Sequence, residues 1–294
     1  MERRAFLRTA ALSTLAAASL SPLSLAQQGN IRQTVRDRAQ NRRAGRSGRP
    51  TRVPIAVQLY PVRNAAAKDL AGTLAAIAKM GYDGVEFAGY YGKDPKELRK
   101  MLDDNNLKCA GTHTGFGELR GDRYEKTAEI HEILGTKFMI VPGGLPNNDL
   151  AKHKEWVDEF NKIAEKAKPR GLFIGYHAHG YDANLLEGIP SWERFFDATV
   201  PEVVMQMDLG NYKNGGGDPY KMIEKFKGRS RTVHLKEGGP NKPIIGEGNV
   251  EWTKAFDMFD AQGATEWYVV EDEHTPDSLD RIEKSVVALR GMGK

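Results

Sequence analysis

The sequence has little cysteine, no glycine-rich nucleotide fingerprint and no apolar run long enough to cross a membrane. Cys109 is the only cysteine, which excludes a disulfide framework within the chain. It lies near the end of an apolar run, so we expect a small buried residue rather than a nucleophile. The N-terminal apolar run, residues 9–20, is too short for a stable membrane span.

The N-terminus carries the pattern of an export signal. Arg3 and Arg4 form a twin arginine ahead of the alanine-rich run, and small residues at 24–26 offer a cleavage site. We therefore expect residues 1–26 to be a twin-arginine signal peptide. Twin-arginine export carries proteins that are already folded, often with a cofactor in place, so the sequence predicts a periplasmic protein.

Residues 27–50 are rich in arginine, glutamine and glycine and show no hydrophobic periodicity, which predicts a basic flexible tether. The first 50 residues hold 10 basic and 2 acidic residues. Removing them from the chain's 43 basic and 39 acidic residues leaves 33 against 37, a formal charge of about −4. The overall charge of +4 thus belongs to the N-terminal segments, and the mildly acidic remainder argues against nucleic-acid binding.

The rest of the chain, residues 51–294, has the size and periodicity of one barrel domain. Apolar runs alternate with segments whose apolar residues are spaced three or four apart, such as 68–81, 94–105 and 156–168. This alternation predicts the α/β class and a (β/α)8 TIM barrel; a doubly wound open sheet is the alternative. The expected strands are the eight apolar runs 54–62, 84–90, 108–113, 137–144, 172–179, 203–208, 232–236 and 267–271.

Residues that bind metals end four successive apolar runs. His177, Asp208, His234 and Glu271 follow one another at steps of about 31, 26 and 37 residues, the length of a strand and a return helix. Because the strands of such a barrel all end at one mouth, the four side chains should converge. Two imidazoles and two carboxylates predict a divalent-metal site.

Other side chains near strand ends are candidates for catalysis. His113 ends the third expected strand. His179 lies two residues after His177, on the same face of its strand, and is either a catalytic group, a metal ligand in place of or beside His177, or a partner of the ligands. Glu86 either supports the mouth through a salt bridge or handles a substrate hydroxyl or a proton. Lys236 either pairs with Glu237 or, with a pKa depressed by a nearby cation and burial, moves a proton.

The remaining acidic and histidine residues rank lower, and the aromatic signal is weak. Asp272 and Glu273 are rival ligands to Glu271, while His131 and His153 are expected on solvated helix surfaces. His274 is unassigned. Aromatic residues expected at the mouth fit stacking on the apolar face of a sugar ring; they are Tyr60, Phe87, Tyr90, Tyr91, Phe116, Tyr181 and Tyr212.

Several short motifs, in register from about residue 53 to the C-terminus, resemble the sugar phosphate isomerase/epimerase family of xylose isomerase-like TIM barrels. The resemblance implies a divalent metal (Mn, Mg, Co or Zn) at the ends of strands five to eight, with Asp208, His234 and Glu271 at matching ligand positions. It also implies proton transfer next to a carbonyl through an enediolate. The motifs are VQLYPVR, GVEFAGYYG, GYHAHGYD, MDLGNY, VHLKEG, GEGNVEW and VVEDE.

The fifth strand departs from the pattern of the better-known epimerases, which carry a glutamate where this chain has His177. Those enzymes use two carboxylates on opposite faces of the substrate, and here only Glu271 of that pair is present. The second proton-carrying group would have to be His177, His179, Glu86 or Lys236. We therefore expect a sugar isomerase or epimerase, with a lyase, dehydratase or glycoside-cleaving enzyme acting on 3-keto-sugars as the alternative.

Two other functions are less well supported by the sequence. An endonuclease for abasic DNA would need more ligands and a basic groove, and a silent sugar-binding barrel would bind no metal tightly. We expect a small carbohydrate substrate, no nucleic acid and no membrane anchor after processing. A homo-oligomer is compatible with the sequence, which leaves the substrate and the identity of the metal open.

Overall fold

The computed structural model describes residues 52–273 and 279–294. The expected signal peptide and tether, together with His274, lie outside these residues. Eight parallel strands form one sheet in the order β8-β5-β4-β3-β2-β1-β10-β9. They are β1 (Ile55–Gln58), β2 (Gly84–Phe87), β3 (Lys108–His113), β4 (Phe138–Val141), β5 (Phe173–His177), β8 (Val204–Gln206), β9 (Thr232–Leu235) and β10 (Trp267–Val270).

The two outer strands of this sheet meet, so the sheet curls into a nearly closed barrel. The contact between β8 and β9 consists of a parallel bridge between Asp208 and His234, in which the His234 N–H donates to Met207 O at 2.9 Å. All eight expected strands are present, and the predicted (β/α)8 barrel is confirmed. The weakest seam of the barrel therefore coincides with two of the expected metal ligands.

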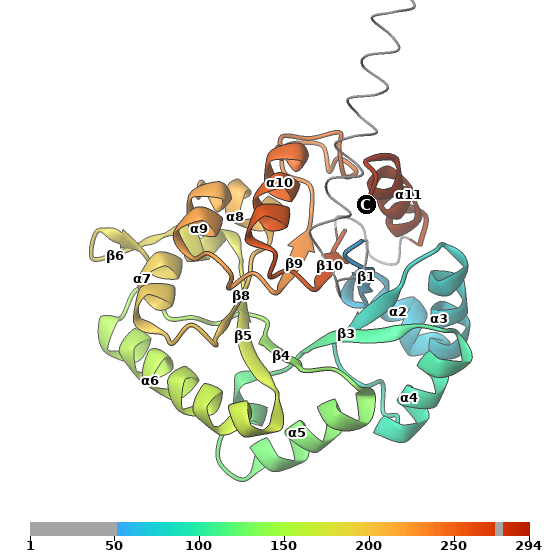
Figure 1. Cartoon of the computed structure of the whole chain (residues 1–294), viewed down its shortest axis with the longest axis horizontal. Coiled ribbons are helices and arrows are strands. Elements are labelled where there is room, and N and C mark those ends of the chain that lie inside the picture. Colours follow the sequence, from blue (N-terminus) through green and yellow to red (C-terminus); the bar gives the residue numbers. More distant parts are fainter. Residues whose placement is uncertain (1–51, 274–278) are drawn as a thin grey trace, which may run out of the picture. The chain divides into compact units, whose positions relative to one another are not determined.

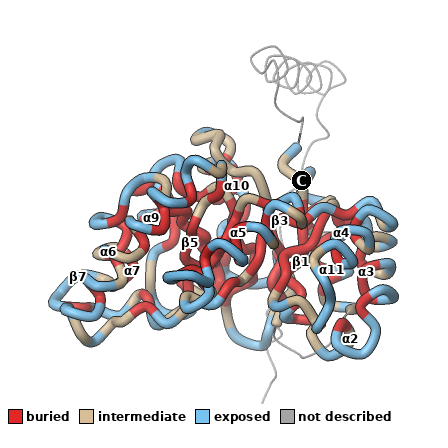
Figure 2. Tube along the Cα trace, turned by 90° about the horizontal axis from the view of Figure 1, so that it is seen from below, coloured by how far each residue is buried: buried red, intermediate tan, exposed pale blue. Residues whose placement is uncertain are grey.

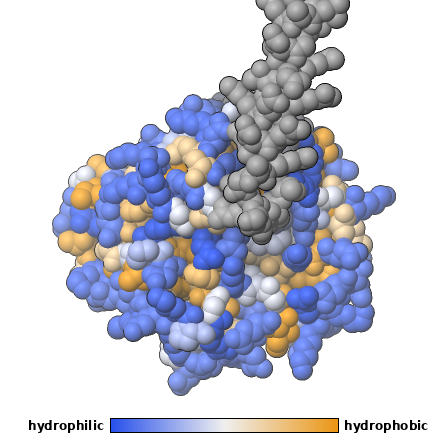
Figure 3. All heavy atoms as spheres, viewed as in Figure 1, coloured by the Kyte–Doolittle hydropathy of each residue, from blue (hydrophilic) through white to orange (hydrophobic). Residues whose placement is uncertain are grey.

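Helices surround the strands (Figure 1) and turn their charged faces to solvent, whereas the strands are buried (Figure 2). The face in Figure 3 is mainly hydrophilic, and none of the described helices combines the length and apolarity needed to span a membrane. The helices are α2 (Arg63–Lys68), α3 (Leu70–Lys79), α4 (Pro95–Asp104), α5 (Arg123–Leu134), α6 (Leu150–Ala167), α7 (Ser191–Ala198), α8 (Leu209–Asn214), α9 (Pro219–Lys225), α10 (Trp252–Gln262) and α11 (Leu279–Gly291).

Local sequence signals fix the helix ends. Asp94 and Asp218 each precede a proline and accept a hydrogen bond from a backbone N–H in the first turn of α4 and α9. Gly135 and Gly263 end α5 and α10 in the left-handed conformation, with φ of 72° and 65°. The expected start at Thr275-Pro276 lies outside the described residues.

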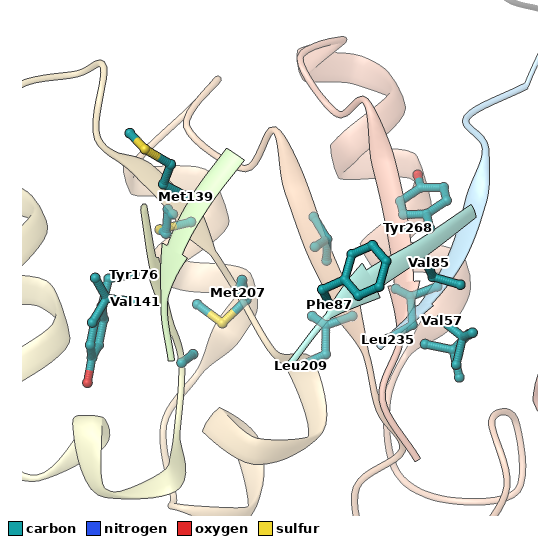
Figure 4. Packing of buried hydrophobic residues seen from close by; sticks show 14 of the residues in the cluster. Val57, Val85, Phe87, Met139, Val141, Tyr176, Met207, Leu209, Leu235 and Tyr268 are labelled. Atoms are coloured by element: carbon teal, nitrogen blue, oxygen red, sulfur yellow. The ribbon is translucent and has the colours of Figure 1, made fainter. Parts of the chain in front are cut away.

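Alternation along the strands separates a hydrophobic shell from a polar interior. Val57, Val85, Phe87, Leu235 and Tyr268 point outward and pack in the core between the strands and the helices (Figure 4). The intervening residues point into the barrel. Some of these interior residues are small or apolar, namely Ala56, Ala110 and Val269. The others are buried polar residues: Gln58, Glu86, His177, Gln206 and His234.

Two helical histidines expected in solvent are buried, so that expectation is wrong. His131 is fully buried; its Nδ1 donates to Thr127 O at 2.7 Å and its Nε2 accepts from Thr112 Oγ1 at 2.7 Å. His153 is also buried and bonds to Pro146 O at 2.8 Å. Polar neighbours in the sequence suggested solvated helix surfaces, but each histidine lies on the inner face of its helix. One ring nitrogen of each bonds to a backbone carbonyl, which makes burial of the ring less costly.

Burial of His131 should make stability depend on pH. Burial lowers the pKa of His131 from 6.5 to about 4, against the smaller opposing effect of its bond to Thr127. Between these two pH values the unfolded chain binds the extra proton, so acidification from pH 6.5 to 4 should cost up to about 3 kcal/mol. Urea unfolding of the parent and of His131→Gln should show a flatter pH profile for the variant. Parallel profiles over this range would contradict the lowered pKa.

Candidate metal centre

The four predicted ligands converge at the mouth of the barrel. His177 ends β5, Asp208 follows β8, His234 lies in β9 and Glu271 follows β10. One donor atom from each lies within 4.8 Å of the others, and all four residues are buried. Strand ends separated by nearly a hundred residues thus supply two imidazoles and two carboxylates to one small volume. This set suits a divalent transition metal.

Glu86 determines which nitrogen of His234 faces the centre. His234 Nε2 donates to Glu86 Oε2 at 2.6 Å, because a carboxylate can only accept. The other nitrogen, Nδ1, lies 3.3 Å from Glu271 Oε2. This hydrogen bond keeps a proton on Nε2, so Nδ1 is the nitrogen that faces the other ligands, as in a carboxylate–histidine–metal arrangement. Burial lowers the pKa of His234, but Glu86 and Glu271 outweigh burial and raise the pKa to about 10, so a cation would take the place of the proton on Nδ1.

Gln206 does the same for His177, its direct neighbour across β5 and β8. The amide Nε2 of Gln206 donates to Glu86 Oε1 at 2.8 Å, so its Oε1 is free to accept. That oxygen accepts from His177 Nδ1 at 3.1 Å. The Nε2 lone pair of His177 therefore faces the centre, 3.5 Å from Glu271 Oε2.

Asp208 divides its two carboxylate oxygens between the fold and the centre. Oδ1 accepts from the Asn211 N–H at 2.6 Å and caps α8, whereas Oδ2 is buried without a hydrogen-bond partner among the described residues. His234 Nδ1 is likewise buried without a hydrogen-bond partner among the described residues. Burial raises the pKa of Asp208, with Lys236 opposing. Buried atoms of this kind are costly unless they bind something, so a cation fits the donor set.

Glu86 lies beneath the four ligands rather than at the mouth. It is fully buried, and both oxygens accept hydrogen bonds, including one from Gln58 Nε2 at 2.8 Å. Burial alone would raise the pKa of Glu86, but His113 and His234 outweigh it and hold the pKa well below its usual range. The geometry therefore fits the supporting role of Glu86 better than proton transfer to a substrate.

His113 joins the same buried network. Its Nε2 lies 3.0 Å from Gln206 Oε1 and 3.1 Å from Glu86 Oε2, and its ring stacks on His234 with centroids 5.1 Å apart. The expected catalytic histidine thus faces inward, toward the groups that orient the ligands.

Two other candidates lie beside the ligands. The His179 ring is perpendicular to that of His177, with centroids 4.8 Å apart. Lys236 pairs with Glu273, not with Glu237. Burial lowers the pKa of Lys236, but Asp208, Glu271 and Glu273 together outweigh burial and raise it. The depression expected beside a bound cation stays a prediction.

Neighbouring acidic residues are engaged elsewhere. Glu237 accepts from the backbone N–H groups of Gly246 and Val250 and from Trp252 Nε1, which ties down the loop between β9 and α10. Asp272 pairs with Arg281 at 2.8 Å. These contacts leave Glu271 as the acidic ligand from β10.

The aromatic expectation holds only in part. Phe87 and Tyr212 are buried in the hydrophobic shell, so their placement at the mouth is wrong. Tyr60 and Tyr181 keep exposed fractions of 45% and 39%. Cys109 is buried as expected.

Sequence reasoning missed Gln58 and Gln206. Both are fully buried amides in otherwise apolar runs. Gln206 lies two residues before Asp208 and hence on the same face of the chain, which is the one signal that could have identified it.

Comparison with known proteins places this site in context. Residues 74–292 match the family model described as xylose isomerase-like TIM barrel. Inosose dehydratase of Geobacillus thermodenitrificans is 26% identical over 257 residues, covering 72% of this chain and 85% of that protein. 3-Dehydroshikimate dehydratase of Pseudomonas putida is 26% identical over 219 residues, covering 68% of this chain. The chain spans only 34% of the length of that Pseudomonas relative.

Solved structures show the same fold. A sugar phosphate isomerase/epimerase from Parabacteroides distasonis superposes with a TM-score of 0.71 at 22% identity, covering 83% of this chain and 96% of that one. D-allulose 3-epimerase from Methylomonas sp. gives 0.65 at 16% identity, covering 82% and 98%. The named relatives and structural neighbours are sugar-modifying enzymes that include both dehydratases and epimerases.

Removing the charge of Asp208 should empty the centre without unfolding the barrel. Asp208→Asn keeps an oxygen to cap α8 but offers no carboxylate to a cation. We expect purified Asp208→Asn to retain little metal by elemental analysis while its circular dichroism matches the parent. Asp218→Asn, at the equivalent cap of α9, is the matched control and should retain metal like the parent. Equal metal in all three proteins would refute the ligand assignment.

Loss of the Gln206 amide should weaken metal binding although Gln206 is not a ligand. Gln206→Leu removes the acceptor that orients His177 and should lower metal affinity by about 10- to 100-fold. Gln58→Leu, which removes a donor to Glu86 but no contact with a histidine, should have a smaller effect. Competition with a chromogenic chelator measures both. An affinity of Gln206→Leu equal to the parent would show that His177 needs no such support.

Proposed function

Because the chain belongs to the xylose isomerase-like TIM barrel family, we propose that it is a metal-dependent enzyme that removes a proton next to the carbonyl of a polyhydroxy ketone. The supporting observation is the convergence of His177, Asp208, His234 and Glu271. Two of their buried atoms, Asp208 Oδ2 and His234 Nδ1, have no hydrogen-bond partner among the described residues. A divalent cation (Mn, Mg, Co or Zn) bound there would polarise the ketone and stabilise negative charge on its oxygen.

His179 is the proposed base and Lys236 the proposed acid. The His179 imidazole lies beside the ligand group without belonging to it, so it can take the proton from the carbon next to the carbonyl. Lys236 is buried, and its ammonium group is held by Glu273 beside Asp208 and Glu271. From there it can donate a proton to an oxygen of the substrate.

The arrangement favours elimination over epimerisation. After proton removal from the α carbon, the electron pair of the C–H bond forms a double bond between the α and β carbons. The hydroxyl group on the β carbon takes the proton from Lys236 and leaves as water. This one-sided reaction needs one base and one acid. Epimerisation needs a proton carrier on each face, and Glu86, one candidate for the second carrier, is enclosed beneath the ligands. We therefore propose a dehydratase or lyase for cyclic keto-polyols or 3-keto-sugars.

An isomerase or epimerase is the second candidate. His179 and Glu271 follow different strands, β5 and β10, so these two groups could supply the opposite faces of a ring. In that reaction His179 would replace the missing strand-five carboxylate. We also propose that the twin arginine directs export to the periplasm, where unphosphorylated sugars are the expected substrates.

The products formed in D2O separate the two reactions. We expect the metal-loaded parent to convert an inosose or a 3-keto-glucoside into an unsaturated product, visible by NMR and mass spectrometry. His179→Asn should lower turnover by about 100-fold or more, because it removes the proposed base. Metal content should stay equal to the parent, since His179 is outside the ligand group.

If a singly deuterated isomer is recovered and no unsaturated product forms, the enzyme is an epimerase and the proposed elimination is wrong. Full turnover by His179→Asn would overturn the assignment of the base in either reaction.

A further inference from the structure

We infer that Gly143 is a positioning residue: its missing side chain allows His179 and Tyr181 to pack against the end of β4, beside the ligand group. This inference rests on the proposed function, which makes His179 the base. Gly143 itself touches none of the four ligands through a side chain, because it has none. Its effect on the reaction would therefore pass through the two aromatic rings that it admits.

The space above Gly143 is filled by these two rings. A Cβ atom built on Gly143 would lie 2.6 Å from Tyr181 Oη and 3.2 Å from His179 Cε1. The first distance is shorter than real contacts of a Cβ atom, and the second is tight. Any larger residue at position 143 would have to displace Tyr181 first and His179 with it.

Tyr181 transmits the constraint because it stacks on His179. The two rings are nearly parallel, 10° apart, with centroids separated by 5.0 Å. Tyr181 Oη accepts from the Gly144 N–H at 3.3 Å, and Asn147 Nδ2 donates to Tyr181 O at 3.2 Å. The loop after β4 thus holds Tyr181 by its hydroxyl, by its backbone and through the open space at Gly143.

The backbone beneath the stack is fixed independently. The His179 N–H donates to Asp182 Oδ2 at 2.7 Å, and Asp182 Oδ1 accepts from the Tyr176 hydroxyl at 3.2 Å. Tyr176 in turn accepts from the Leu145 N–H at 3.1 Å, which joins the loops after β4 and β5. With the backbone held in this way, the direction of the His179 side chain depends on Tyr181 and on the room at Gly143.

Gly143→Ala tests the inference. We expect the variant to keep the metal content of the parent but to lose about tenfold or more in kcat, because small misplacements of a catalytic group are costly. Adding Tyr181→Phe removes the oxygen nearest the new methyl group and should restore part of the lost rate. Gly143 has a φ of 157°, which L residues rarely adopt, so the control must carry backbone strain as well. Gly89→Ala is that control: Gly89 follows β2, has a φ of 104° and has nothing within 4 Å of a built Cβ.

A second readout does not depend on turnover. Diethylpyrocarbonate modifies accessible imidazoles, and the rate at His179 can be followed by peptide mass spectrometry. Displacement from β4 should make His179 react faster in Gly143→Ala than in the parent, and the double variant should return toward the parent. Gly89→Ala should leave the rate unchanged.

The two readouts separate the failure of this inference from that of the proposed function. If the parent turns over no ketone, the proposed function fails, and the modification rates still decide whether Gly143 positions His179. Parental kcat together with parental reactivity of His179 in Gly143→Ala would overturn the inference.

Discussion

The buried carboxylate of Glu86 is the constraint on which the candidate centre depends. A charge inside a barrel is stable only if donors surround it. The chain supplies donors from both sides of the barrel: Gln58 from β1, and Gln206 and His234 from β8 and β9. Each donor is then fixed in orientation. These orientations turn Nε2 of His177 and Nδ1 of His234 toward the other ligands. The residues that orient the candidate ligands therefore lie one layer below them.

Closure of the barrel and assembly of the centre use the same residues. Among the described strands, the backbone pairing of β8 with β9 is limited to the bridge between Asp208 and His234, and Gln206 Nε2 adds a side-chain hydrogen bond to Thr232 Oγ1 at 3.4 Å. The short β8 ladder ends at Gln206, and the chain then turns into α8 with Asp208 as its cap. A cation held by Asp208 and His234 would therefore also join the two strands that the backbone joins least.

The sequence allowed the strands and the convergence of four ligand-type side chains to be predicted, because strand ends in a parallel barrel share one mouth whatever the loops do. It did not reveal the layer beneath. Gln58 and Gln206 are ordinary amides within apolar runs, and only the register beside Glu86 and His177 gives them a role. His131 and His153 show the opposite error: their polar neighbours in the sequence predicted exposure, but both side chains are buried on the inner face of their helices. The surroundings of Lys236 were equally hidden, because Asp208, Glu271 and Glu273 gather around it only in the folded chain.

His177 stands where the epimerases that this chain resembles are expected to carry a glutamate. A glutamate there would place a second carboxylate within a few ångströms of Glu271; the imidazole Nε2 lies 3.5 Å away instead. Burial, with nearby imidazoles adding to it, lowers the pKa of His177 well below its usual value, so the ring is neutral. The ligand set therefore carries one negative charge fewer and lacks one base. His179, two residues further along the same face, can supply the missing base without giving up a ligand.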